Sequence, residues 1–492
     1  MTFPVPIDQH LRSTRREALL RTGLGLGWLG AASVLEAEAR AANASLPSTA
    51  AAGPAADRLP RSQAPRPPHF AARARAVIHL FANGGPSHLD TFDRKVALEK
   101  YAGQEVPGTL PTERRTGAAL PSPFAFRRHG ESGLEISDLF PSVARHADRL
   151  LVVRSMHADV PNHEPSLMLM NCGDSRLVRP AAGAWVTYGL GTENQNLPGF
   201  VAMCPGGYPI KGTENWRSAF LPGAYQGTYV DTNKRKVEEL VENVRHPFLD
   251  RDAQRRQFEL TAALDRRHLA TRDHDPQLES RLASMELAWR MQAEAGDAFD
   301  VAREPQHVRD RYGDDVQGRQ MLIARRLIER GVRYVQVWHG AGQPWDSHDA
   351  IRENHGRLAK ECDKAIGALL DDLVALGLLE STLVLWGGEF GRTPTVELPQ
   401  PGTGITEISG RDHNHHGFSV WMAGGGVKGW TAYGATDELG FKAVEKPVHV
   451  HDLQATLLHC LGLDHTRLTF RHSGRDFRLI DVHGRVIEDW LA

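Results

Sequence analysis

Short apolar runs of strand-like composition alternate along this chain with longer amphipathic segments that have helical periodicity, and this alternation constrains the fold most strongly. The helical pattern 320–330 ends at Gly331 and leads directly into the apolar run 332–339. A second long helical pattern, 358–379, leads into the run 382–386. Such alternation is typical of a mainly parallel sheet with helices on both faces. The sequence therefore predicts a doubly wound α/β fold, with further strands at 76–82, 150–154 and 418–423.

Three donor-rich stretches adjoin these runs. WDSH (345–348) follows the run 332–339, WGGEFGRTP (386–394) continues from the run 382–386, and GRDHNHHG (410–417) precedes the run that begins at Phe418. Ligands and metal ions collect outside the carboxyl ends of strands in open α/β sheets, so we expect donors from these stretches to converge. The donors are side chains that Zn²⁺, Mn²⁺ or Ca²⁺ accept: Asp346, His348, Glu389, His413, His415 and His416. The alternative is a Gly-bounded loop network held by ordinary hydrogen bonds.

Two loops in the N-terminal half offer further candidates. The first predicted strand is followed by GGPSHLDTFD, in which the Asp90 carboxylate could close a metal shell together with Glu389. The second is followed by SMHADVPNHEPS, which contains His163, Glu164 and Ser166. The Gly-Gly turn would let the backbone approach an anion or a metal closely, although for the glycines alone a plain tight turn is the better explanation.

The N-terminus indicates where the protein works. Arg15 and Arg16 precede an apolar, Gly-rich segment, and Ala39-Arg40-Ala41 offers a small-x-small cleavage site, so residues 1–41 are interpreted as a twin-arginine signal peptide. We therefore expect the twin-arginine export machinery as a partner and a periplasmic or extracellular location. The apolar segment is too short and too poor in large side chains for a stable membrane span, so none is expected in the mature protein.

The remaining chain is divided by composition. Residues 42–75 are rich in Ala, Pro, Ser and Arg and are predicted to be a flexible linker, and 76–492 form the folded domain. Within that domain, 237–302 is a charged helical insertion without a donor cluster. A solvent-facing helical hairpin is the favoured interpretation of the insertion, ahead of a lid or a dimer surface.

Charge and cysteine content exclude some functions. The net charge of -2 gives no electrostatic basis for binding nucleic acid or an anionic membrane. The cysteines have no CxxC spacing, so they form neither a metal knuckle nor a recognisable disulfide framework. Buried free thiols are expected at all four positions, Cys172, Cys204, Cys362 and Cys460.

Several of these stretches together resemble one known family. The motifs are GGPSHLDTFD, RSMHADVPNHEP, WDSH, WGGEFGRTP, GRDHNHHGFSVWMAGGGVKG and GATDELGFKAVEKPVHVHDLQATLLHCLGLD. They resemble the exported bacterial family catalogued as domain of unknown function 1501, which is itself similar to the alkaline phosphatase and sulfatase superfamily. The resemblance implies an alkaline phosphatase-like core with one or two divalent metals at the carboxyl edge of the sheet. The ligands that it implies are Asp90, Asp346, His348, Glu389, and His415 or His416.

The chain departs from that superfamily at the nucleophile. Phosphatases and sulfatases place Cys, Ser or Thr at a helix start, where His163 stands in this sequence, and Ser166 is predicted to lie inside the helix. A water activated by the metal is then the expected nucleophile, with Glu164 or His163 as its base. Arg392 could grip the anion through its planar fork, or it could equally anchor a loop by binding a carbonyl.

Two functions follow from the sequence. The first is an exported metal-dependent hydrolase of sulfate or phosphate esters, whose substrate is a small molecule or a polysaccharide. The second is a non-catalytic exported protein that keeps the fold and the metal in order to bind or assemble with another exported protein. The missing nucleophile favours the second function, and the density of donor residues favours the first.

Overall fold

A computed structural model describes residues 63–107, 110–240, 248–270, 284–291, 296–398 and 405–492. The predicted signal peptide and most of the predicted linker lie outside these ranges. In the described part of the chain, no helix is both long enough and apolar enough to cross a membrane.

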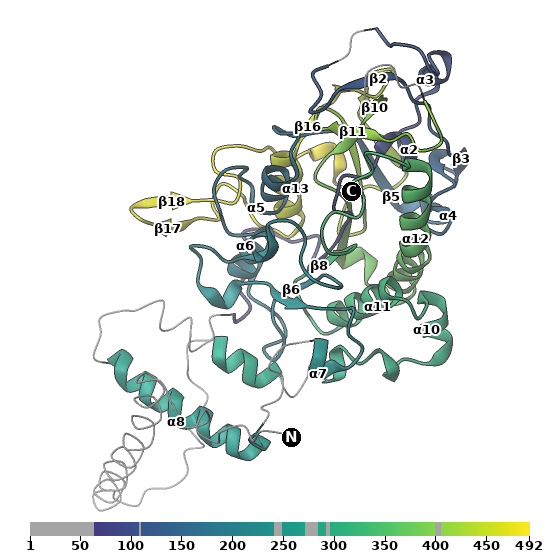
Figure 1. Ribbon diagram of the computed structural model, residues 1–492. Coiled ribbons are helices and arrows are strands. Elements are labelled where there is room, and N and C mark those ends of the chain that lie inside the picture. The colour runs from purple at the N-terminus through teal and green to yellow at the C-terminus, as the bar shows by residue number, and fades with distance from the viewer. Residues whose placement is uncertain (1–62, 108–109, 241–247, 271–283, 292–295, 399–404) are drawn as a thin grey trace, which may run out of the picture. The chain divides into compact units, whose positions relative to one another are not determined.

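A nine-stranded sheet forms the centre of the described chain (Figure 1). Five adjacent strands run parallel in the order β9-β1-β8-β6-β7. They are β9 (Thr382–Gly387), β1 (Ala76–Phe81), β8 (Tyr334–Trp338), β6 (Phe200–Met203) and β7 (Thr228–Val230). All six residues of β1 are buried, as expected for a strand that is covered on both faces.

The other half of the sheet contains an antiparallel strand. β12 (Phe418–Ala423) runs antiparallel to both β9 and β5 (Leu150–His157), so its first residue lies at the same edge as the carboxyl ends of those two strands. Two short strands, β13 (Thr431–Tyr433) and β16 (Val448–His449), pair parallel with β5. This geometry brings the stretch before β12 to the carboxyl edge of the sheet.

Helices pack against both faces of the sheet (Figure 1). One face carries α4 (Pro141–Ala144), α11 (Val316–Glu329) and α12 (Ile351–Ala375), which share an apolar core with Ile78 and Leu80. The opposite core contains Val77 and Phe81 together with three other helices, α5 (His163–Cys172), α6 (Ala182–Leu190) and α13 (Val450–Cys460). The predicted α/β class, the mainly parallel sheet and the helices on both faces are confirmed.

A second, three-stranded sheet was not predicted. β10 (Gly391–Glu397) pairs antiparallel with β2 (Thr116–Ala119) and with β11 (Arg411–Asn414). The residues of β10 and β11 are polar and lack the apolar run that predicts a strand. Most of their side chains are nonetheless buried. The charged ones have partners elsewhere in the fold: Arg392 pairs with Asp346, and Arg411 pairs with Asp90.

Two predicted segments also have counterparts in the structure. The described part of the insertion at 237–302 is helical in α7 (Val237–Leu240), in α8 (Arg251–Ala270), at 284–291 and at 296–298, whereas 248–250 and 299–300 are not helical. Residues 63–75 were assigned to the linker, but their backbone bonds to the domain: His69 N–H donates to the Gly462 carbonyl and Arg75 N–H to that of Ser381. All four cysteines are buried and unpaired, as predicted.

Candidate metal centre

Four side chains meet at the carboxyl edge of the central sheet. The ligand atoms of His163, Asp346, His348 and His413 all lie within 4.8 Å of one another. They come from three parts of the fold: His163 is the first residue of α5, Asp346 and His348 follow β8, and His413 lies in β11. Of the donors expected to converge, Asp346, His348 and His413 therefore lie together.

The carboxylate of Asp346 lies at the centre of this group. Its oxygens are 3.2 Å from Nε2 of His163, 2.9 Å from Nε2 of His348 and 3.2 Å from Nε2 of His413. Only the contact from His413 has hydrogen-bond geometry; Nε2 of His163 and Nε2 of His348 are buried and make no hydrogen bond within the described chain. Three imidazole nitrogens thus lie close to one carboxylate, and only one of them forms a hydrogen bond with it. This is the arrangement expected of atoms that share a cation.

Each of the three imidazoles has its other nitrogen against a glutamate. Nδ1 of His163 lies 2.7 Å from Oε1 of Glu389, Nδ1 of His348 contacts Glu397, and Nδ1 of His413 contacts Glu113. Histidines that bind metals commonly donate the second ring N–H to a carboxylate, which fixes the tautomer and leaves the other nitrogen as the ligand. With a metal bound, that tautomer would present all three Nε2 atoms to the ion beside Asp346.

Electrostatics favour a cation at this point. Burial lowers the pKa of His348, but the carboxylates of Asp346 and Glu397 outweigh it and raise the pKa to about 9. The pKa of His163 is also raised, because Asp346 and Glu389 outweigh the effect of burial. Burial dominates at His413 and lowers its pKa to about 3. A potential that retains a proton on two histidines would also retain a metal ion.

The carboxylates of the site outnumber its permanent cations. Among the described residues, only two permanent cations form salt bridges with these carboxylates. Arg392 pairs with Asp346, and Arg114 pairs with Glu397. Asp412 is fully buried and its Oδ1 has no hydrogen-bond partner in the described chain. The carboxylates concerned are Asp346, Glu389, Glu397, Glu113 and Asp412. A divalent cation would compensate this excess of negative charge.

The turn after β1 supports the site. Gly84 has a φ of +112°, and a Cβ at this position would lie 2.5 Å from the backbone nitrogen of Asp346. Its N–H donates to both oxygens of Glu389, at 3.0 and 3.2 Å, and Glu389 is itself fully buried. A glycine is required at position 84 because any side chain would displace the strand-end loop that carries Asp346.

Some residues predicted as ligands lie elsewhere. Asp90 is fully buried in a two-point ion pair with Arg411, at 2.8 and 3.2 Å, and is not among the clustered donors. The rings of His415 and His416 pack against each other, with centroids 3.9 Å apart, and both residues lie outside the cluster. Glu389 lies against Nδ1 of His163, on the side of the ring away from Asp346, and is not among the clustered donors.

The residues predicted to be catalytic also have other environments. His163 has a carboxylate near each ring nitrogen, which suits a ligand better than a base. Glu164 is exposed, and the Ser166 hydroxyl lies inside α5 and donates to the Val160 carbonyl. The guanidinium of Arg392 is fully buried and donates to the carbonyls of Gly84, Gly85, Trp345 and Arg411 and to Asp346. Of the two roles considered for Arg392, the structure shows the loop anchor.

Sequence reasoning missed Glu113, Glu397 and Asp412. Asp412 stands beside His413 in a stretch that had already been singled out, so it could have been included with the other donors. Glu397 lies at the end of β10, which had not been recognised as a strand. Glu113 precedes two arginines in a charged segment, a pattern that normally indicates an exposed loop.

Comparison with known proteins identifies the family. Among solved structures, a sulfatase from Pseudoalteromonas sp. is 12% identical over 80% of this chain and 68% of its own, with a TM-score of 0.33. A lipoteichoic acid synthase from Listeria monocytogenes is 8% identical over 85% and 78%, with a TM-score of 0.33. A mutant of TAB5 alkaline phosphatase is 9% identical over 72% and 92%, with a TM-score of 0.29. No curated protein sequence matches the chain. The family model described as "Protein of unknown function (DUF1501)" matches residues 74–491, and the chain belongs to this family.

Proposed function

We propose that this protein is an exported, metal-dependent hydrolase of sulfate or phosphate esters. The observation that carries the proposal is the convergence of three imidazole Nε2 atoms on the Asp346 carboxylate, with a glutamate behind each ring. Imidazole and carboxylate donors in this ratio suit zinc, and manganese less well, whereas calcium prefers six to eight oxygen ligands. Of the metals considered from the sequence, zinc therefore fits this donor set best.

Solvent access supports catalysis rather than a purely structural role. Asp346 and His348 retain 20% and 17% of their side-chain surface, so a substrate can approach from their side. A bound divalent ion would activate water and neutralise charge on an ester oxygen. His163, Asp346, His348 and His413 would hold the ion, and Glu389, Glu397 and Glu113 would orient the three rings. The substrate would be a small-molecule or polysaccharide ester.

Two observations favour the alternative of an exported protein that binds metal without catalysis. Four protein ligands are the number found in closed structural zinc sites, whereas catalytic sites keep a position open. Arg392, the candidate for gripping an anion, has its guanidinium bonded to backbone carbonyls and Asp346. In this alternative, the surface around the site would contact another exported protein.

One experiment separates the two functions. His163→Ala and His348→Ala should each lose most of the bound metal, measured by mass spectrometry on protein purified after export, because each removes a ligand. His416→Ala is the matched control, because it removes a histidine outside the cluster and should keep the metal. Hydrolysis of nitrophenyl phosphate and nitrophenyl sulfate should follow the metal content across the variants.

The outcomes are distinct. Wild-type protein that holds metal but cleaves neither ester, nor natural sulfated or phosphorylated saccharides, would support the non-catalytic function. Wild-type protein that holds no divalent metal after export and does not bind added zinc would overturn both functions.

A further inference from the structure

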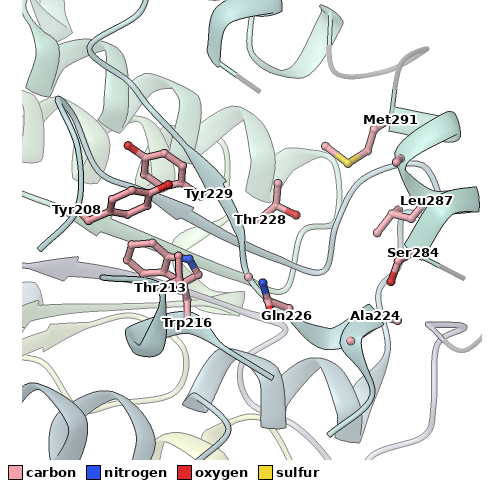
Figure 2. A pocket seen from close by; sticks show the side chains of 13 residues that line it. Tyr208, Thr213, Trp216, Ala224, Gln226, Thr228, Tyr229, Ser284, Leu287 and Met291 are labelled. Carbon is pink, nitrogen blue, oxygen red and sulfur yellow. The ribbon is translucent and has the colours of Figure 1, made fainter. Parts of the chain in front are cut away.

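A cavity of about 510 Å³ lies between the loop after β6, the segment around β7 and the helical residues 284–291 (Figure 2). Cavities of this size are typical of small-molecule sites in proteins. None of the residues that line this cavity was predicted to bind a metal, and none belongs to the candidate metal centre.

One wall of the cavity is a stack of aromatic rings (Figure 2). The centroids of Tyr208 and Tyr229 are 4.6 Å apart, and Tyr229 stacks on Trp216 at 5.8 Å with an interplanar angle of 4°. Trp216 is buried, whereas Tyr208 is 48% exposed. The inner rings therefore hold the outer ring in place, which leaves Tyr208 as a rigid aromatic surface that a ligand can cover with little loss of conformational entropy.

The other described residues of the lining are uncharged, and some of them are polar. Thr213, Gln226 and Thr228 face the cavity, and their side chains make no hydrogen bond within the described chain. The Tyr229 hydroxyl donates to the carbonyls of Cys204 and Gly207, and burial raises its pKa, so it stays neutral. Leu287 and Met291 add an apolar wall opposite the rings (Figure 2). Among the residues that the structure describes, no lysine, arginine, histidine, aspartate or glutamate lines the cavity.

This combination fits a neutral sugar ring, and we propose that the cavity binds a neutral pyranose unit of a saccharide. The C–H face of a pyranose is apolar and can pack on an aromatic ring, while its hydroxyls require donors and acceptors such as Thr213, Gln226 and Thr228. A nucleotide would also stack on the rings, but its phosphates require cations, and none of the described lining residues is a cation. A purely apolar ligand would leave the free hydroxyls and the amide unsatisfied.

The cavity is connected to the candidate metal centre through the backbone. Gly342 N–H donates to the Tyr208 carbonyl at 3.0 Å, and Gly342 forms a parallel bridge with Pro209. The same loop continues to Asp346. β6 and β8 are parallel neighbours, so both loops leave the same edge of the sheet. If the proposed hydrolase function holds, on which this last step rests, the substrate is an ester on a saccharide chain whose neutral neighbouring sugar occupies the cavity.

Direct binding tests the sugar site without relying on hydrolysis. The probes are neutral oligosaccharides of two to four glucose, galactose, mannose or fucose units, titrated into exported, metal-loaded protein by calorimetry and by tryptophan fluorescence. We expect at least one series to bind saturably. Tyr208→Ala should weaken that binding about tenfold or more, because it removes the exposed ring, and Thr228→Val should weaken it less. Trp430→Ala is the control, because Trp430 is 57% exposed and does not line the cavity.

The results separate this inference from the proposed function. His348→Ala should lose metal yet bind the saccharide normally, since it does not line the cavity. Saccharide binding without ester cleavage would leave the sugar site intact and count against the hydrolase. The inference is overturned if no neutral saccharide binds, or if Tyr208→Ala, with an unchanged melting temperature, binds as tightly as wild type.

Discussion

Glu389→Gln tests whether the glutamates behind the histidines tune the metal centre. The Glu389 carboxylate is fully buried, lies 2.7 Å from Nδ1 of His163 and accepts the N–H of Gly84. Glutamine has almost the same shape and keeps one acceptor oxygen, so the fold should survive. It removes the negative charge that makes the imidazole of His163 a stronger donor and that fixes its tautomer.

The expected loss can be estimated from comparable sites. Removing a carboxylate that orients a histidine ligand costs about 10- to 100-fold in metal affinity, equivalent to about 1.4 to 2.7 kcal/mol. Glu397→Gln should give a similar loss through His348. The double variant should lose less than the product of the two effects, because both histidines contact the same Asp346 carboxylate and the two changes are therefore coupled.

The assay is competition for zinc with a chromophoric chelator, followed at constant pH. Glu445→Gln is the matched control, because Glu445 is exposed and lies outside the donor clusters. If Glu389→Gln binds zinc as tightly as wild type while His163→Ala releases it, the glutamate does not tune the ligand. If His163→Ala also binds zinc normally, His163 is not a ligand and the proposed set of metal ligands is wrong.

Three further predictions concern stability, mechanism and export. Burial lowers the pKa of His79 to about 3, so its contribution to the free energy of unfolding is complete above pH 6.5 and is lost as the pH falls from 6.5 toward 3. Urea titrations of wild type and His79→Gln at pH 7 and pH 5 should show that the variant loses about 2 kcal/mol less of its unfolding free energy between the two pH values. Equal losses would contradict the assignment. Ser166→Ala should retain most of any esterase activity, because the Ser166 hydroxyl is bonded to a backbone carbonyl inside α5; an inactive variant with intact metal would identify Ser166 as the nucleophile. The double variant Arg15→Lys, Arg16→Lys should leave the precursor in the cytoplasm on fractionation, and unchanged export would remove the twin-arginine assignment.

The sequence predicted the framework of the fold well because that framework depends on local patterns. The apolar runs at β1, β8 and β9 formed close to their predicted ranges. The long helix predicted at 358–379 is α12, which lies earlier in the chain, at Ile351–Ala375. Asp346 and His348 were found for the same reason: they follow a strand that is long and apolar enough to be recognised. β10 and β11 were missed because buried polar strands lack that signal.

The choice of ligands could not be predicted because it depends on contacts between residues far apart in the chain. The tract from His413 to His416 contains three histidines, and only the one inside β11 joins the cluster, since the strand ends at Asn414. Asp90 resembles a ligand in the sequence, but Arg411, 321 residues away, neutralises it. Whether Glu389 binds a metal or orients a histidine depends on displacements of a few ångströms, which no spacing in the sequence encodes.

The same separation along the chain determines when the site can form. His163 and Glu389 are 226 residues apart, and His413 and Glu113 are 300 residues apart, so each ring meets its glutamate only after the sheet has assembled. A metal ion would therefore bind the folded chain far better than the unfolded one and would stabilise it accordingly. Loading would thus require the folded chain, and it could begin wherever folding takes place. The twin-arginine route carries chains that are already folded, so it would place metal loading in the cytoplasm, where the cell controls which metal ions are available. A chain threaded unfolded across the membrane would instead acquire its metal after export. The proposed signal peptide and the candidate metal centre are therefore linked: the metal found in exported protein should be the one supplied in the cytoplasm, even when a different divalent ion is in excess outside.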